Sequence, residues 1–274
     1  MRMPLPAPVD YVAENSRSYL QYTEFNKSPV HRVRLACIIS MLEKSVAPAG
    51  GKVLEVGCGT GNIAIPIASL GYEMTACDIH APSIGEASGK NPFPNLKFLC
   101  GSLGAVNPAE YKAIVLTEVL EHVPACRDML AAISGSMRSD AALIVTVPNG
   151  WGVTELMCRP SYALKKIPGG SILVKRVKAM LKTEDLTTGN LCTPHVNFFT
   201  LGRLARLFGV CGMEVASFSR CFFLWPLWET FLSKRGCPAA WPENDFRISQ
   251  SLPPAWCSFW CMLLKKSTGC IRGS

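Results

Sequence analysis

Val53-Leu-Glu-Val-Gly-Cys-Gly-Thr-Gly-Asn-Ile-Ala64 is the stretch of this 274-residue chain that decides its fold. An apolar run at 53–56 is followed by glycines at positions 57, 59 and 61, and then by an apolar segment that continues to Leu70. Glycine permits positive φ and lets the backbone approach a ligand closely, while a helix N-terminus presents free N–H groups. The stretch therefore predicts a strand, a tight turn and a helix that form a nucleotide-type cofactor site.

A second apolar segment, 72–76, leads to Asp78, roughly 20 residues beyond the glycines, where a carboxylate hydrogen-bonds a ribose. The glycine spacing departs from a dinucleotide fingerprint, because the third glycine falls one residue early and Asn62 takes its place. Glu55 stands two residues before the first glycine. A carboxylate there would repel a pyrophosphate but attract a cationic sulfonium.

The pattern Glu55-x-Gly57-x-Gly59-x-Gly61 resembles motif I of class I S-adenosylmethionine-dependent methyltransferases. The resemblance implies S-adenosylmethionine as the cofactor. In that family the turn after the third strand lies against the adenine and often carries an Asp, where this chain has Ser102. The residues that the resemblance and the strand ends imply for cofactor binding are Glu55, Gly57, Cys58, Gly59, Gly61, Asp78, Ile79, Ser102, Leu103 and Thr117.

Strand and helix patterns alternate along the chain, which predicts an α/β fold with a parallel sheet, helices on both faces and ligands at the carboxyl ends of the strands. The resemblance implies a Rossmann-like sheet of seven strands with the last pair antiparallel. We expect strands at 53–56, 72–77, 96–100, 113–117, 141–147, 213–219 and near 255–264, and helices at 30–45, 62–70, 82–89, 125–138 and 200–209.

One domain of 1–274 is expected, because 49% of the residues are hydrophobic and can form one large core. Its predicted parts are N-terminal helices at 1–48, a cofactor-binding core at 49–150, a helical insertion or lid at 151–194, and the C-terminal part of the sheet at 195–274. The last part includes a Trp- and Pro-rich insertion at 222–254, whose aromatic residues include Trp225, Trp228, Phe231 and Trp241. These aromatics would either wall an apolar pocket or pack in the core.

Glu118-Val-Leu-Glu121-His122 follows the fourth predicted strand, at the same edge of the sheet as the glycine turn. This sequence, with the later Pro148-Asn149 turn, resembles the ubiquinone-biosynthesis O-methyltransferase (methyltransferase type 11/23) group. The same E-x-x-E-H occurs in small-RNA 3′-terminal 2′-O-methyltransferases, where it binds a divalent cation with a His from a later H-x-x-F segment. That resemblance implies a metal site of Glu118, Glu121, His122 and His195 for Mg²⁺, Mn²⁺ or Zn²⁺.

Three interpretations of this block stay open. A cation would lower the pKa of an acceptor hydroxyl and orient it for attack on the sulfonium methyl group. Alternatively, Glu121, His122 and His195 would be the catalytic residues, with His122 or His195 as a general base that needs no metal. Finally, E-x-x-E-H would simply order the turn.

The charge is uneven along the chain. Residues 1–150 hold 12 Lys and Arg against 13 Asp and Glu, whereas residues 151–274 hold 16 against 7. A basic second half favours an anionic substrate or surface. Within it, 171–182 (SILVKRVKAMLK) reads as a basic amphipathic helix, either a lid or a contact with a membrane surface.

The N-terminus lacks the apolar region of a signal peptide, no stretch is long and apolar enough to span a membrane, and the 13 cysteines form no C-x-x-C pair. These features favour a cytoplasmic protein, with peripheral contact at the inner membrane surface as the alternative. We expect an enzyme that methylates an oxygen of a small-molecule or lipid-linked acceptor. The rivals are an RNA 2′-O-methyltransferase and a non-catalytic cofactor-binding subunit of a partner.

Overall fold

The computed structural model describes residues 29–152, 156, 195–224 and 241–267. The first part of the predicted N-terminal helices, 1–28, and most of the predicted helical insertion at 151–194, with its segment 171–182, lie outside these residues. So do three of the four aromatics singled out in the Trp- and Pro-rich insertion, Trp225, Trp228 and Phe231.

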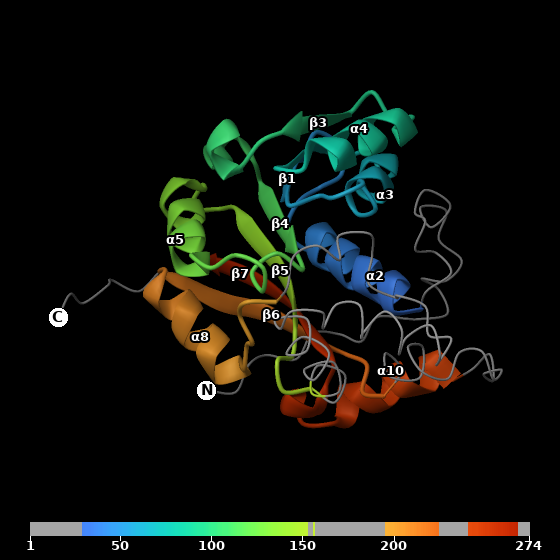
Figure 1. Ribbon diagram of the computed structural model, residues 1–274, viewed down its shortest axis with the longest axis vertical. Helices are drawn as coiled ribbons and strands as arrows, with labels where there is room; N and C mark the ends of the chain where they lie inside the picture. Colours follow the sequence, from blue (N-terminus) through green and yellow to red (C-terminus); the bar gives the residue numbers. More distant parts are fainter. Residues whose placement is uncertain (1–28, 153–155, 157–194, 225–240, 268–274) are drawn as a thin grey trace, which may run out of the picture.

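A single sheet of seven strands runs through the described part of the chain in the order β3-β2-β1-β4-β5-β7-β6 (Figure 1). Strands β1 to β5 pair in parallel, and β7 is antiparallel to both β5 and β6. The predicted sheet is therefore confirmed. The strands are β1 (Lys52–Val56), β2 (Glu73–Asp78), β3 (Leu96–Cys100), β4 (Ala113–Thr117), β5 (Ala142–Pro148), β6 (Met213–Cys221) and β7 (Phe259–Lys266).

Helices cover both faces of this sheet, as expected for strands that are buried on both sides. They are α2 (Pro29–Glu43), α3 (Ala64–Ser69), α4 (Ala81–Lys90), α5 (Cys126–Ser136), α8 (Leu201–Val210) and α10 (Trp241–Ser251). In Figure 1, α5 and α8 lie on one side of the sheet and α2 and α3 on the other.

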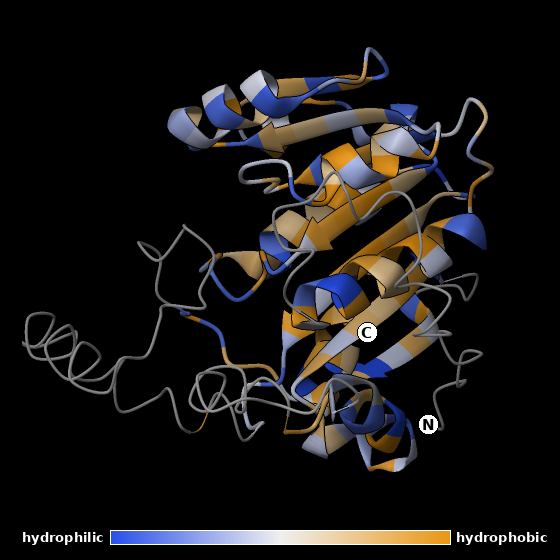
Figure 2. Cartoon of the chain, turned by 90° about the vertical axis from the view of Figure 1, so that its right-hand side faces the viewer, coloured by the Kyte–Doolittle hydropathy of each residue, from blue (hydrophilic) through white to orange (hydrophobic). Residues whose placement is uncertain are grey.

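Alternation along each strand divides the core into two layers. Val53 packs in the layer beneath α2 and α3, whereas its neighbour Leu54 packs in the layer beneath α5 and α8. The same division holds on β4 and β5, so their apolar runs are buried on both faces, and Figure 2 shows the central strands coloured mainly as hydrophobic.

The C-terminal part differs most from expectation. Strand β7 begins at Phe259 rather than near 255, because Pro254–Trp256 forms a 3₁₀ turn and the carbonyl of Pro254 accepts a hydrogen bond from the indole of Trp260. The insertion contains the unpredicted helix α10, in which Phe246 is buried. The carboxylate of Asp245 accepts hydrogen bonds from the backbone N–H groups of Phe223 and Leu224, and so ties α10 to the end of β6.

Among the described residues, no helix combines the length and the apolar character that crossing a bilayer requires.

Candidate functional site

The turn after β1 has the backbone that its glycines predict. Gly57, Gly59 and Gly61 all have positive φ, at 79°, 51° and 81°. The N–H groups of Gly57 and Cys58 both donate to the carbonyl of Cys77, which fixes the turn to the end of β2. A Cβ on Gly57 would lie 2.6 Å from Cγ2 of Val119, so the turn touches the loop that follows β4.

Asp78 ends β2 and organises the mouth of the turn. Its Oδ2 accepts a hydrogen bond from the N–H of Gly59 at 2.8 Å, and its Oδ1 accepts one from the N–H of His80 at 2.8 Å. Each carboxylate oxygen has a second lone pair, so both retain the capacity to accept a ribose hydroxyl. The position predicted for the ribose carboxylate is therefore occupied by a group already oriented by backbone donors.

Glu55 lies below this turn. Its side chain is buried, and burial together with the nearby charge of Asp78 raises the pKa of its carboxyl to about 8, against the effect of a hydrogen bond from the backbone of Ala64. A buried carboxyl with a raised pKa is a potential partner for a cation, because a nearby positive charge would favour its ionised form.

The other predicted cofactor residues also lie where the parallel strands end, an edge they share because of their register. Ile79 follows β2 at this edge, with 79% of its surface exposed. Ser102 and Leu103 follow β3, and Leu103 is half-buried. Thr117 ends β4, and its hydroxyl is buried with no hydrogen-bond partner in the described part of the chain.

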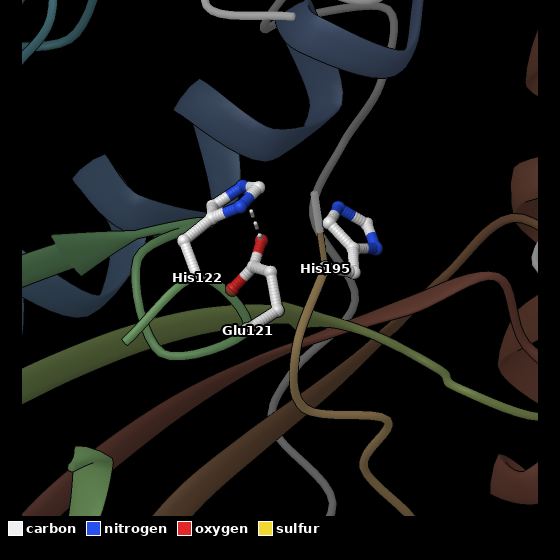
Figure 3. Close-up of side chains that lie close together, drawn as sticks. All are labelled: Glu121, His122 and His195. Carbon is white, nitrogen blue, oxygen red and sulfur yellow. Dashed lines mark ion pairs between the residues drawn. The ribbon is translucent and has the colours of Figure 1, made fainter. Parts of the chain in front are cut away.

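Glu121, His122 and His195 come together beside this edge (Figure 3). One ligand atom from each lies within 4.8 Å of the others. The carboxylate of Glu121 is fully buried, and its Oε1 lies 3.9 Å from Nε2 of His122. The rings of His122 and His195 meet edge to face with centroids 4.8 Å apart. We call these three residues the Glu-His cluster.

Glu118 does not join the Glu-His cluster, although the sequence pattern grouped it with the other three. Its Oε2 pairs with the guanidinium of Arg34 at 3.2 Å, and its Oε1 accepts a hydrogen bond from the hydroxyl of Thr146 at 3.1 Å. The fourth ligand that the resemblance implies therefore faces α2 and β5.

Asn197 is a site residue that sequence reasoning missed. The backbone N–H groups of Val196 and Asn197 both donate to the carbonyl of Glu121, at 2.8 and 3.1 Å. The Asn197 side-chain amide donates to the carbonyls of Leu120 and Val123, at 3.0 and 2.8 Å. These bonds hold the segment of His195 against the loop of Glu121 and His122. The sequence could have indicated this residue, because Asn197 belongs to the same His-Val-Asn-Phe segment by which His195 was identified.

Comparisons with known proteins show the family of the chain. A family model described as a methyltransferase domain matches residues 30–217. The ubiquinone biosynthesis O-methyltransferase of Salmonella paratyphi A is 25% identical over 191 residues, which cover 64% of this chain and 79% of the relative. The mitochondrial ubiquinone biosynthesis O-methyltransferase of Schizosaccharomyces pombe is 31% identical over 131 residues, 45% of this chain and 48% of the relative.

Solved structures share the fold. Magnesium protoporphyrin IX methyltransferase from Synechocystis, with bound S-adenosylhomocysteine, has a TM-score of 0.51 at 14% identity and covers 96% of this chain and 90% of its own. An S-adenosylmethionine-dependent methyltransferase from Mesorhizobium loti has a TM-score of 0.53 at 9% identity, and the match covers 84% of this chain and 98% of that one. With a family model that matches more than half of its length, the chain belongs to the methyltransferase-domain family and is a class I S-adenosylmethionine-dependent methyltransferase.

Proposed function

We propose that this methyltransferase moves the methyl group of S-adenosylmethionine to an oxygen of a small-molecule or lipid-linked acceptor, and that the Glu-His cluster prepares that oxygen. The observation that carries the proposal is the contact between the two parts of the site. Val119 packs against Gly57 of the cofactor turn and lies on the loop that supplies Glu121 and His122. A nucleophile beside the cluster would therefore lie near a methyl donor bound at the glycines.

The reaction is an in-line displacement. The acceptor oxygen forms a bond to the methyl carbon while the carbon–sulfur bond breaks, and the sulfonium becomes a neutral thioether. The acceptor hydroxyl loses its proton, which His122 or His195 accepts as a general base and later releases to water. The buried carboxylate of Glu121, 3.9 Å from His122, stabilises the imidazolium that this transfer creates.

A divalent cation is a second candidate for the same step, and the donor set of the cluster favours it. Two imidazoles and one carboxylate are the ligands of many catalytic zinc sites, and their donor atoms lie within 4.8 Å of one another. A bound cation would lower the pKa of the acceptor hydroxyl. The candidate ligands are Glu121, His122 and His195, whereas Glu118 is committed to Arg34 and Thr146.

The names of the relatives support the proposed acceptor class. Those reported above carry names that place them in ubiquinone biosynthesis as O-methyltransferases, which supports a small or lipid-linked acceptor over RNA. The Glu-His cluster beside the cofactor turn supports an enzyme over a non-catalytic subunit.

The acceptor class can be tested by incubating the full chain with methyl-labelled S-adenosylmethionine and separate lipid, small-molecule and RNA fractions of a cell extract. We expect label in an alkali-stable methyl ether in the lipid or small-molecule fraction. Label in RNA would establish the rival acceptor, and no transfer to any fraction would contradict the proposed reaction.

Contact with a membrane surface is the further part of this proposal. It is supported by the basic amphipathic pattern of 171–182 and by the excess of Lys and Arg in 151–274. Flotation with anionic and with neutral liposomes tests it. Binding to anionic vesicles should weaken when Lys175, Arg176 and Lys178 are replaced by Gln, and equal flotation of both proteins would exclude a role for this segment.

A further inference from the structure

Glu118 has a strained backbone at the first position of the loop after β4. Its φ is 54°, and Phe222 is the other non-glycine residue with positive φ among those described. The backbone of a residue other than glycine rarely adopts this conformation, so surrounding contacts must hold Glu118 in it. Residues kept in such conformations often lie where a chain must present functional groups in one direction.

Three groups of contacts hold Glu118 in place. Its N–H donates to the carbonyl of Thr146 at 3.1 Å and lies 3.2 Å from the Thr146 hydroxyl. That hydroxyl donates to Oε1 of Glu118 at 3.1 Å. The second carboxylate oxygen pairs with Nη2 of Arg34 at 3.2 Å, and the two side chains are only 13% and 24% exposed. Partial burial makes this ion pair stronger than one on the open surface.

Arg34 is itself fixed to the sheet. It lies on α2, which packs against β5, β6 and β7, and its guanidinium lies 4.9 Å from the centre of the Phe259 ring. The ion pair therefore connects the start of the loop that carries Glu121 and His122 to helix α2 and strand β7, which both contribute to the buried core.

The loop that leaves Glu118 is fixed again at its far end. The N–H of His122 donates to the carbonyl of Val119 at 3.0 Å, and Asn197 holds the carbonyls of Leu120 and Val123. A change of direction at Glu118 would thus displace Glu121 and His122 from His195.

We propose that Arg34 and Glu118 are positioning residues, whose ion pair holds the loop of the Glu-His cluster in its reactive orientation. The inference rests on the proposed function for its effect on rate. It gives Glu118 a role other than that of a metal ligand, and it gives α2 a role in the reaction.

The test compares Arg34→Gln with the wild type in three measurements on the full chain. The first is the rate of label transfer from S-adenosylmethionine to the cell-extract fraction that accepts it. The second is calorimetric titration with S-adenosylhomocysteine. The third is the ring signals of His122 and His195 in ¹H–¹³C spectra, recorded well below the unfolding temperature, with each signal assigned by a His→Gln variant.

Arg34→Gln should lower the rate by about tenfold or more, since a small misplacement of catalytic groups is enough to do so, while it leaves the affinity for S-adenosylhomocysteine unchanged. The signals of His122 and His195 should shift and that of His80 should not. Arg34→Lys should restore part of the rate. Lys112→Gln is the matched control, because it breaks an ion pair with Asp140 at the opposite end of β4 and should change neither the rate nor the signals.

A wild-type rate and unshifted histidine signals in Arg34→Gln would overturn the inference, even if the variant melts at a lower temperature. If Arg34→Gln fails to fold, Glu118→Gln tests the inference by the same measurements. This substitution keeps the shape of the Glu118 side chain and removes its charge. If the wild type itself transfers no methyl group, the proposed function fails, while the histidine signals still decide whether the pair orients the loop.

Discussion

A methyl group on Gly57 would come within 2.6 Å of Cγ2 of Val119, so these two residues bring the glycine turn into direct contact with the loop that carries Glu121 and His122. Only a residue without a side chain permits this approach at a φ of 79°.

Gly57→Ala should therefore abolish binding of S-adenosylhomocysteine, because the added Cβ both strains the backbone and pushes Val119 away. Calorimetry of the purified variant measures this loss. Gly71→Ala is the control, since Gly71 also has positive φ, at 93°, but nothing lies within 4 Å of its Cβ position. We expect it to lose about 1–2 kcal/mol of stability and to bind normally. Normal binding by Gly57→Ala would show that the contact with Val119 is dispensable.

Glu55 predicts how stability depends on pH. Its folded pKa of about 8 lies above the ordinary value of 4.5, so between these two pH values the folded state holds a proton that the unfolded state has released. The contribution of Glu55 to the free energy of unfolding is fully present below the unfolded pKa. As pH rises to the folded pKa, this contribution is lost, and the free energy of unfolding falls by about 1.4 kcal/mol per pH unit.

Glu55→Gln should remove this slope, which denaturant unfolding between pH 5 and pH 8 would show. Glu73→Gln, at an exposed position at the start of β2, should keep it. An unchanged slope in Glu55→Gln would mean that Glu55 is ionised throughout this range.

Asn197→Ala should destabilise the protein and slow the reaction together. It removes a buried hydrogen bond to Leu120 and a partly buried one to Val123 and leaves their carbonyls without these donors, at a cost of about 1–3 kcal/mol. Thermal unfolding and label transfer measure both effects. Asn107→Ala, which removes an exposed cap from a 3₁₀ turn, should change only stability and by less. A fully active Asn197→Ala variant would show that Asn197 is not needed to position His195.

Patterns within short stretches of sequence predicted most of the fold. The strands and the glycine turn depend on local periodicity and on φ preferences that neighbouring residues specify, whereas the seven-stranded sheet with its antiparallel last pair was implied by the family resemblance. Local reasoning placed Glu121 and His122 at the edge after the fourth strand, whereas His195 was joined to them only by the resemblance to the small-RNA methyltransferases. The direction of Glu118 could not be predicted, since Arg34 and Thr146, both distant in sequence, set it. Helix α10 was missed because tertiary bonds from Asp245 hold it.

If the Glu-His cluster binds a metal ion, substitutions can show whether three residues bind that ion or whether Glu118 is a fourth ligand. The metal candidate predicts that, in equilibrium dialysis with Zn²⁺ or Mn²⁺, the wild type binds one ion and Glu121→Gln and His195→Ala each lose it. Glu118→Gln should weaken binding less than either of these, because the Glu118 carboxylate faces Arg34 and affects the ion only through the position of the loop. EDTA should stop methyl transfer, and adding the ion back should restore it. Full activity in EDTA would leave His122 or His195 as a base that acts without a cation.

His195→Ala should lower the rate by about 10²–10⁴-fold, the usual contribution of an acid–base group, while the protein still binds S-adenosylhomocysteine. His80→Ala is the control, because His80 contacts Ser83 on α4 outside the cluster. Loss of cofactor binding in His195→Ala would assign this histidine a structural role instead.

The central claim is that a sulfonium donor binds across the ends of β1 and β2, against Asp78. Titration of the full chain with S-adenosylhomocysteine, with NAD⁺ and with a buffer blank tests it most directly. We predict saturable binding of S-adenosylhomocysteine by the wild type, no binding of NAD⁺, and loss of the first in Asp78→Ala. No heat with S-adenosylhomocysteine, or binding of NAD⁺ in its place, would contradict the account.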